Sequence, residues 1–108
     1  MRLVIKTAAD GLWWTLVQSA DDDGRPLARG VGPCPDVAAC RAAVSVLGGP
    51  GLRKSAQQTG ADQWRWQVAG ADGTVVAEST DTFDSAAACG YALYELRSEL
   101  ARGAPLVR

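Results

Sequence analysis

The distribution of hydrophobic and polar residues predicts a series of short β-strands. From 64 to 69 hydrophobic and polar side chains alternate, so that Trp64, Trp66 and Val68 share one face. This two-residue period is typical of a strand with one buried face. The Asp-Gly pairs at 10–11 and 72–73 are typical of tight turns between strands. We therefore expect strands at 2–7, 12–17, 26–31, 52–58, 64–69, 74–79 and 104–108.

Two segments instead show the spacing of an amphipathic helix, with hydrophobic residues at intervals of three and four. We expect the first helix at 36–47 and the second from about 86 to 101. Asp36 and Ser85 stand where residues that cap helix N-termini are expected. The two hydrophobic stripes are Cys40, Ala43, Val44 and Leu47 in the first helix, and Cys89, Ala92, Leu93, Leu96 and Leu100 in the second.

The chain also contains an internal repeat. Residues 23–47 and 72–96 align without a gap at a constant offset of 49, and both hold an Asp-Gly turn, an Ala-Ala-Cys step and a later leucine. Copies of such a repeat are supersecondary units that bury their hydrophobic faces against one another. We therefore expect a single domain over residues 1–108, made of two repeats at about 1–51 and 52–108.

The repeat also decides which face of the second strand is buried. Aligning the alternate hydrophobic positions of 12–16 with those of 64–68 keeps every inward position hydrophobic. A shift of one residue would exchange the two faces of the strand. With this alignment Trp13, Val17 and Arg65 are expected on the face of the sheet away from the helices.

Composition narrows the classes of protein to be considered. Hydrophobic residues make up 47% and charged residues 21% of the chain, as is typical of a soluble globular domain. The formal net charge of −1 argues against nucleic acid as a partner, and no hydrophobic run is long enough to span a membrane. Three cysteines, an odd number, fit a reducing compartment, so we expect a cytoplasmic protein without a signal peptide.

Three motifs of the second copy carry a family resemblance. They are the alternating aromatics of WRWQVAGADG, the step Thr82-Phe83-Asp84-Ser85 and the helical step Gly90-Tyr91-Ala92-Leu93. In these motifs the chain resembles the YegP-like family of small bacterial proteins, over essentially its whole length as two tandem copies. The first copy departs from the pattern at Pro33-Cys34-Pro35 and at Arg41.

The resemblance implies an α+β fold. The expected architecture is a pseudo-symmetric tandem pair of β-β-β-α-β units that form one antiparallel sheet, with two helices on one face. The last strand of each unit is expected to be exchanged with the other unit. The resemblance implies no activity and brings no catalytic or binding residues with it.

Few residues of the chain suggest catalysis. It has no histidine, which is the commonest general base and the commonest metal ligand. Cys40 and Cys89 are expected as small core side chains, although the repeat could bring them together as a redox pair. Cys34 precedes a helix N-terminus, where a thiol pKa can be lowered, but no base accompanies it. The acidic run 21–23 lacks the ligand spacing of a calcium loop. We expect no enzyme activity, no cofactor and no metal.

The candidate interaction face consists of Trp13, Val17 and Arg65, since an exposed hydrophobic patch usually marks an interaction site. The sequence therefore favours a non-enzymatic interaction module that acts through the open sheet face or a sheet edge. Its partner would be a second copy of the chain or another protein. The alternative is a single-stranded nucleic-acid-binding protein that stacks bases on the sheet aromatics, which would show affinity falling steeply with salt. A thiol-dependent enzyme using Cys34 is a third hypothesis.

Overall fold

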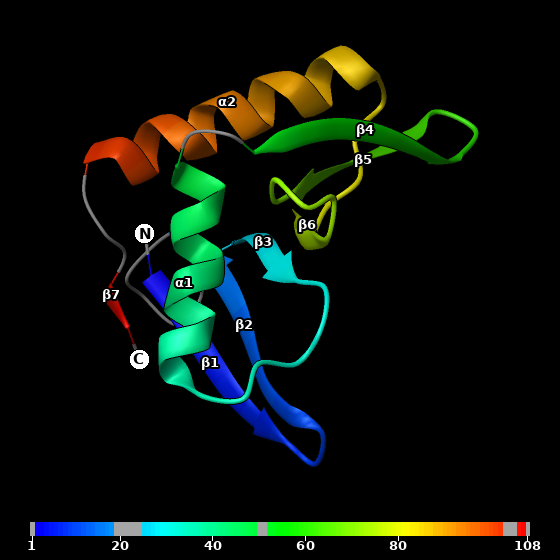
Figure 1. Cartoon of the computed structure of the whole chain (residues 1–108). Helices are drawn as coiled ribbons and strands as arrows, with labels where there is room; N and C mark the ends of the chain where they lie inside the picture. The colour runs from blue at the N-terminus through cyan, green and yellow to red at the C-terminus, as the bar shows by residue number, and fades with distance from the viewer. Residues whose placement is uncertain (1, 19–24, 50–51, 103–105, 108) are drawn as a thin grey trace.

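The computed structural model describes residues 2–18, 25–49, 52–102 and 106–107. These residues form an α+β fold in which two helices pack on a mostly antiparallel sheet (Figure 1). The expected strands and helices are all present, with ends that differ by one to a few residues from the prediction. In chain order they are β1 Arg2–Ala8, β2 Gly11–Val17, β3 Pro26–Gly30, α1 Val37–Gly48, β4 Arg53–Gly60, β5 Gln63–Ala69, β6 Val75–Ser79, α2 Ala86–Arg102 and β7 Leu106–Val107.

The order of the strands across the sheet is β4-β5-β6-β3-β2-β1-β7. The first six strands pair antiparallel with their neighbours, and the two groups of three meet where β3 pairs with β6. β7 pairs with β1 in parallel, so the expectation of a purely antiparallel sheet is wrong for this last strand. The physical reason is that β1 and β7 are not joined by a hairpin, so no tight turn between them imposes antiparallel pairing.

Each helix begins at a residue that caps its free backbone N–H groups. The Asp36 carboxylate accepts a hydrogen bond from the Ala39 backbone N–H at 2.8 Å. The Ser85 hydroxyl accepts one from the backbone N–H of Ala88 at 3.1 Å. Both predicted caps are therefore confirmed, and they fix the residue at which the chain turns from the sheet into each helix.

The loop before each helix is fastened to a strand in the same way. Leu12 and Cys34 exchange two backbone hydrogen bonds of 2.8 and 2.7 Å, and Trp64 and Phe83 exchange two of 2.7 Å. Gly11 lies beside the first of these bridges with φ +138°, and a Cβ there would be 2.9 Å from the carbonyl oxygen of Cys34. Glycine is therefore required at this turn, both for its backbone angle and for the close approach of the loop.

The core lies between the helices and one face of the sheet. Its sheet side consists of the alternate strand positions that the sequence marks as hydrophobic, and its helix side consists of the two predicted stripes except Ala92. Trp14 and Trp66 are each only 2% exposed, which confirms the chosen alignment of the second strand. The largest members of this core are Leu3, Trp14, Leu16, Leu47, Trp66, Val68, Leu93 and Leu96.

Candidate functional site

The face of the sheet opposite the core is not covered by either helix of the described residues. Side chains of successive strand residues alternate between the two faces, so the positions that flank the core residues point to this open face. The strand registers align one row of these positions across six strands. From one side of the sheet to the other the row is Val4, Thr15, Arg29, Glu78, Gln67 and Ser55.

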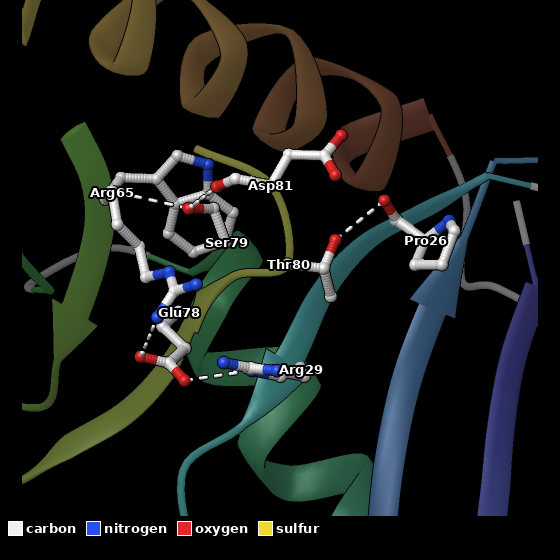
Figure 2. Close-up of polar contacts among 8 residues, drawn as sticks. Pro26, Arg29, Arg65, Glu78, Ser79, Thr80 and Asp81 are labelled. Carbon is white, nitrogen blue, oxygen red and sulfur yellow. Dashed lines mark hydrogen bonds and ion pairs between the residues drawn. The ribbon is translucent and has the colours of Figure 1, made fainter. Parts of the chain in front are cut away.

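A cluster of three charged side chains lies at the middle of the open face. The guanidinium of Arg29, on β3, donates from Nε to Oε1 of Glu78, on β6, at 2.9 Å. Arg65, on β5, places its Nη1 3.9 Å from Oε2 of the same carboxylate. Figure 2 shows the Glu78 side chain between the two arginines. Because the Glu78 side chain is only 17% exposed, solvent screens these interactions less than it would at a fully exposed site.

The end of β6 is joined to neighbouring strands by a set of shorter polar contacts, also drawn in Figure 2. The buried hydroxyl of Ser79 accepts a hydrogen bond from the Trp66 backbone N–H at 3.2 Å and donates one to the Asp81 carbonyl at 2.8 Å. The Thr80 hydroxyl donates to the carbonyl of Pro26 at 2.7 Å. These bonds connect the end of β6 to β5 on one side and to β3 on the other.

The structure places the three predicted interaction residues at separate points. Trp13 is partly exposed, and its indole Nε1 donates to Oδ1 of Asp10 in its own hairpin at 2.9 Å. Val17 follows a register shift in β2 and is only 7% exposed, so it offers little surface to a partner. The Arg65 side chain is 25% exposed and belongs to the charged cluster. Two strands separate β2 from β5, so Trp13 and Arg65 are at least about 14 Å apart.

Of the charged cluster only Arg65 was selected from the sequence, whereas Arg29 and Glu78 were not. Its members have opposite charges at Arg29 and Glu78, which are equivalent positions in the two copies at the offset of 49. That opposition of charge at one repeat position is a signal from which the contact could have been inferred. It requires the further inference that β3 and β6 are neighbours, which the local pattern does not provide.

The cysteines lie in the core and in its border. Cys40 and Cys89 are core side chains, as expected, and Cys40 lies beside Cys34. Burial, and then the hydrogen bond with Cys34, raise the pKa of the Cys40 thiol to about 11. Burial also raises the pKa of Cys89. Both thiols are thereby kept protonated at neutral pH, and a protonated thiol is a poor nucleophile and a poor metal ligand.

A groove of about 440 Å³ runs between α2 and the start of β3. Arg25 Nε donates to Oδ2 of Asp81 at 2.9 Å across its rim, so the charges of these two residues are mutually compensated. Tyr91 and Glu95 on α2 form another part of the wall, and a hydrogen bond to Glu95 is the main cause that raises the pKa of Tyr91. The polar groups of this groove are therefore largely engaged with one another.

Three further features were compared with expectation: metal-binding side chains, membrane-spanning helices and similarity to known proteins. Among the described residues no group of three or more metal-ligating side chains is present, and the acidic run 21–23 lies outside them. No helix in the described part of the chain is long and apolar enough to cross a membrane. Comparisons with protein-family models, with curated proteins and with solved structures found no match.

Proposed function

We propose that this protein is a small non-enzymatic interaction module that binds a protein partner through the open face or an edge of its sheet. The observation that carries the proposal is the open face itself, which spans six strands and is left uncovered by both helices. A rigid sheet face of this size offers a partner a surface whose side chains are already fixed, which lowers the entropic cost of binding.

Two features of the open face give the proposal its residues. Trp13 is a partly exposed tryptophan, and tryptophan is enriched among the residues that dominate binding energy. Arg29 and Arg65 share a single carboxylate, Glu78, so the cluster keeps one positive charge that an acidic group of a partner can approach. One remaining charge is few for a nucleic-acid binder, because affinity for the phosphate backbone grows with the number of cations that replace counterions.

The non-enzymatic part of the proposal rests on the residues available for chemistry. The chain has no histidine, and burial disfavours the thiolate forms of Cys40 and Cys89. Cys34 exchanges backbone bonds with Leu12 and lies beside the Cys40 thiol, where its position is explained by the fold.

We also propose that the domain is a tandem pair of equivalent units and a YegP-like protein. The pairing of β3 with β6 supports the first part, because Arg29 and Glu78 are equivalent at the offset of 49 and lie directly opposite each other. Two equivalent residues can face each other in this way only at a two-fold axis. Such an axis would pass through the charged cluster and relate residues 1–51 to 52–108.

The test is quantitative capture of partners from a lysate of the native host on the immobilised chain. Trp13→Ser should reduce capture by about 30-fold, corresponding to about 2 kcal/mol for an interface tryptophan, with an unchanged thermal transition. Val37→Ser is the matched control, because Val37 is 43% exposed at the start of α1, away from the open face. Undiminished capture by Trp13→Ser, or unfolding of that variant, would refute the role of Trp13.

The nucleic-acid alternative is tested with the same protein. A fluorescent single-stranded oligonucleotide should show no binding at physiological salt. Tight binding whose affinity falls steeply between low and high salt would favour the alternative over the protein partner.

A further inference from the structure

The two outer strands of the sheet differ in how their edges are treated. The outer edge of β1 is paired with β7 at its first two residues, Arg2 with Leu106 and Leu3 with Val107. No described residue pairs with the outer edge of β4, which is the longest strand at eight residues. An unpaired edge of this length presents backbone donors and acceptors to any other strand that approaches it.

The hydrogen bonds of β5 show which residues of β4 have free backbone groups. Trp64 exchanges both of its backbone hydrogen bonds with Phe83, on the side of β6. The backbone N–H and C=O groups of successive strand residues point to opposite sides, so the residues beside Trp64 direct these groups to β4. Arg65 therefore forms its backbone hydrogen bonds with its partner Gln57. Odd-numbered residues of β4 therefore bond to β5, and the outward groups belong to Lys54, Ala56 and Gln58.

The sequence of β4 carries the features that usually protect an edge only at its two ends. It contains no proline, and its two charges, Arg53 and Lys54, stand together at one end. The register shift that would disturb pairing falls after Gln58, at the other end. Between these ends the strand is neutral, and a neutral, regular edge of this kind favours pairing with another strand.

A groove of about 480 Å³ lies between this strand and α2. Its walls combine the β4 residues Lys54 and Ala56 with a stripe of α2 that includes Gly90, Tyr94 and Ser98. Tyr94 is 69% exposed, and a Cβ added at Gly90 would meet no atom within 4 Å. The side of α2 above the free edge is therefore open to a neighbouring element as well.

We propose that a second copy of this chain pairs with the free edge, β4 to β4, antiparallel about a two-fold axis at Ala56. This inference rests on the proposed function and names the partner for the sheet edge. Antiparallel self-pairing requires both members of each hydrogen-bonded pair to direct their groups outward. Only registers that pair even-numbered residues with even-numbered residues meet this requirement. An axis at Ala56 pairs Lys54 of each copy with Gln58 of the other and Ala56 with Ala56, so all three outward residues form hydrogen-bonded pairs.

This register also separates the like charges of the two copies. Lys54 of one copy faces a neutral glutamine, and the two Lys54 residues are four residues apart along the pair. That distance is about 14 Å, which exceeds the Debye length of about 8 Å at physiological salt. In an isologous contact residue i of one copy faces residue j of the other and j faces i, so only Ala56, which lies on the axis, faces its own equivalent.

The same axis brings the two α2 helices together. α2 packs over both β4 and β5, so it lies about one strand spacing, ~5 Å, from the proposed axis. The two helices would then lie about 10 Å apart, which is the distance at which helices pack. Tyr94 and the small residues beside it would form that contact and add a hydrophobic layer to the paired strands.

The first experiment removes an outward backbone donor without changing the fold. Sedimentation of the purified chain from about 5 µM to about 500 µM should show a dimer that dissociates on dilution. Ala56→Pro removes an outward N–H only, so it should abolish the dimer and keep the thermal transition. Ser55→Pro is the matched control, because it removes an inward N–H bonded to β5 and should lower the thermal transition.

The second experiment tests the register and does not depend on the folding of a proline variant. Gln58 is exposed in the monomer, and each dimer would place two of these side chains opposite Lys54. Gln58→Glu should tighten the dimer by about 2- to 30-fold through two cross-strand ion pairs, and Gln58→Lys should weaken it by a similar factor.

The proposal is overturned if the wild-type chain and Gln58→Glu both remain monomeric at the highest concentration. It is equally overturned if a dimer forms and responds to neither Gln58→Glu nor Gln58→Lys. If the chain stays monomeric but still captures a partner through Trp13, the dimer proposal is refuted and the proposed function stands. If the dimer forms as described and Trp13→Ser still captures a partner normally, the dimer stands and the role of the open face is refuted.

Discussion

The close contact between Gly30 and Trp14 gives the sharpest test of the core. A Cβ built on Gly30 would lie 2.6 Å from Nε1 of Trp14 and 3.0 Å from both Cδ1 and Cε2. Ordinary van der Waals contact begins at 3.4 Å, so Gly30→Ala overlaps three atoms of one ring. Trp14 is 2% exposed and lies within the core cluster, so its ring cannot move aside into solvent.

The expected loss of folding stability in Gly30→Ala follows from the confinement of the Trp14 ring. Overpacking a well-packed core typically costs about 1–3 kcal/mol, and the shortest contact here favours the upper end. In a domain of this size a loss of about 2 kcal/mol in folding stability lowers the thermal midpoint by about 8–16 °C. Urea unfolding followed by tryptophan fluorescence measures the free energy directly, and circular dichroism shows whether the fold is retained.

Gly32→Ala is the matched control, because the same change there meets no atom within 4 Å. A second comparison combines Gly30→Ala with Trp14→Phe, whose smaller ring has more room to move away from the added methyl group. The double variant should lose less stability than the sum of the two single variants. Equal urea midpoints for Gly30→Ala and Gly32→Ala would refute the packing of Trp14 against β3.

Two further predictions concern the helix side of the core. Leu96→Ala should cost about 2–5 kcal/mol, because Leu96 is 5% exposed, and a urea midpoint equal to that of the wild type would contradict its burial. The pKa of Cys40 is raised from 9.0 to about 11, so the fold holds this proton more tightly than the unfolded chain does. The resulting stability is complete below pH 9 and falls by up to about 1.4 kcal/mol per pH unit toward pH 11. Cys40→Ala should flatten this fall, and an unchanged slope would show that Cys40 does not cause it.

Much of the fold could be predicted from local patterns. The two-residue period of 64–69 and the helical stripes indicate which side chains are buried, and the spacing of the buried positions distinguishes a strand from a helix. Asp36 and Ser85 could be assigned because capping depends on residues within one turn. The inward orientation of Trp14 followed from comparing the two copies, since either copy alone leaves the register open.

Contacts between distant parts of the chain could not be predicted in the same way. The parallel pairing of β7 depends on the path of α2 across the molecule, and no local pattern encodes that path. The burial of Ser79 depends on the Trp66 N–H and the Asp81 carbonyl that its hydroxyl joins, while the sequence shows only a polar residue in a turn. The candidate site was affected most, because Val17 is buried and follows a register shift that the alternation of residues does not indicate.

The differences between the two halves bear most directly on function. If the halves are equivalent, as we propose, then β1 and β4 are the same strand in two copies, and only β1 has its outer edge covered. The cause lies in the connections: the described chain leaves α1 and enters β4 with no separate strand between them, whereas α2 is followed by β7. A domain made of two equal units would otherwise cover both edges or neither. If the halves are equivalent, the free edge of β4 follows from joining them in one chain, and among the described residues it is the longer of the two terminal strands at which a further strand can be added.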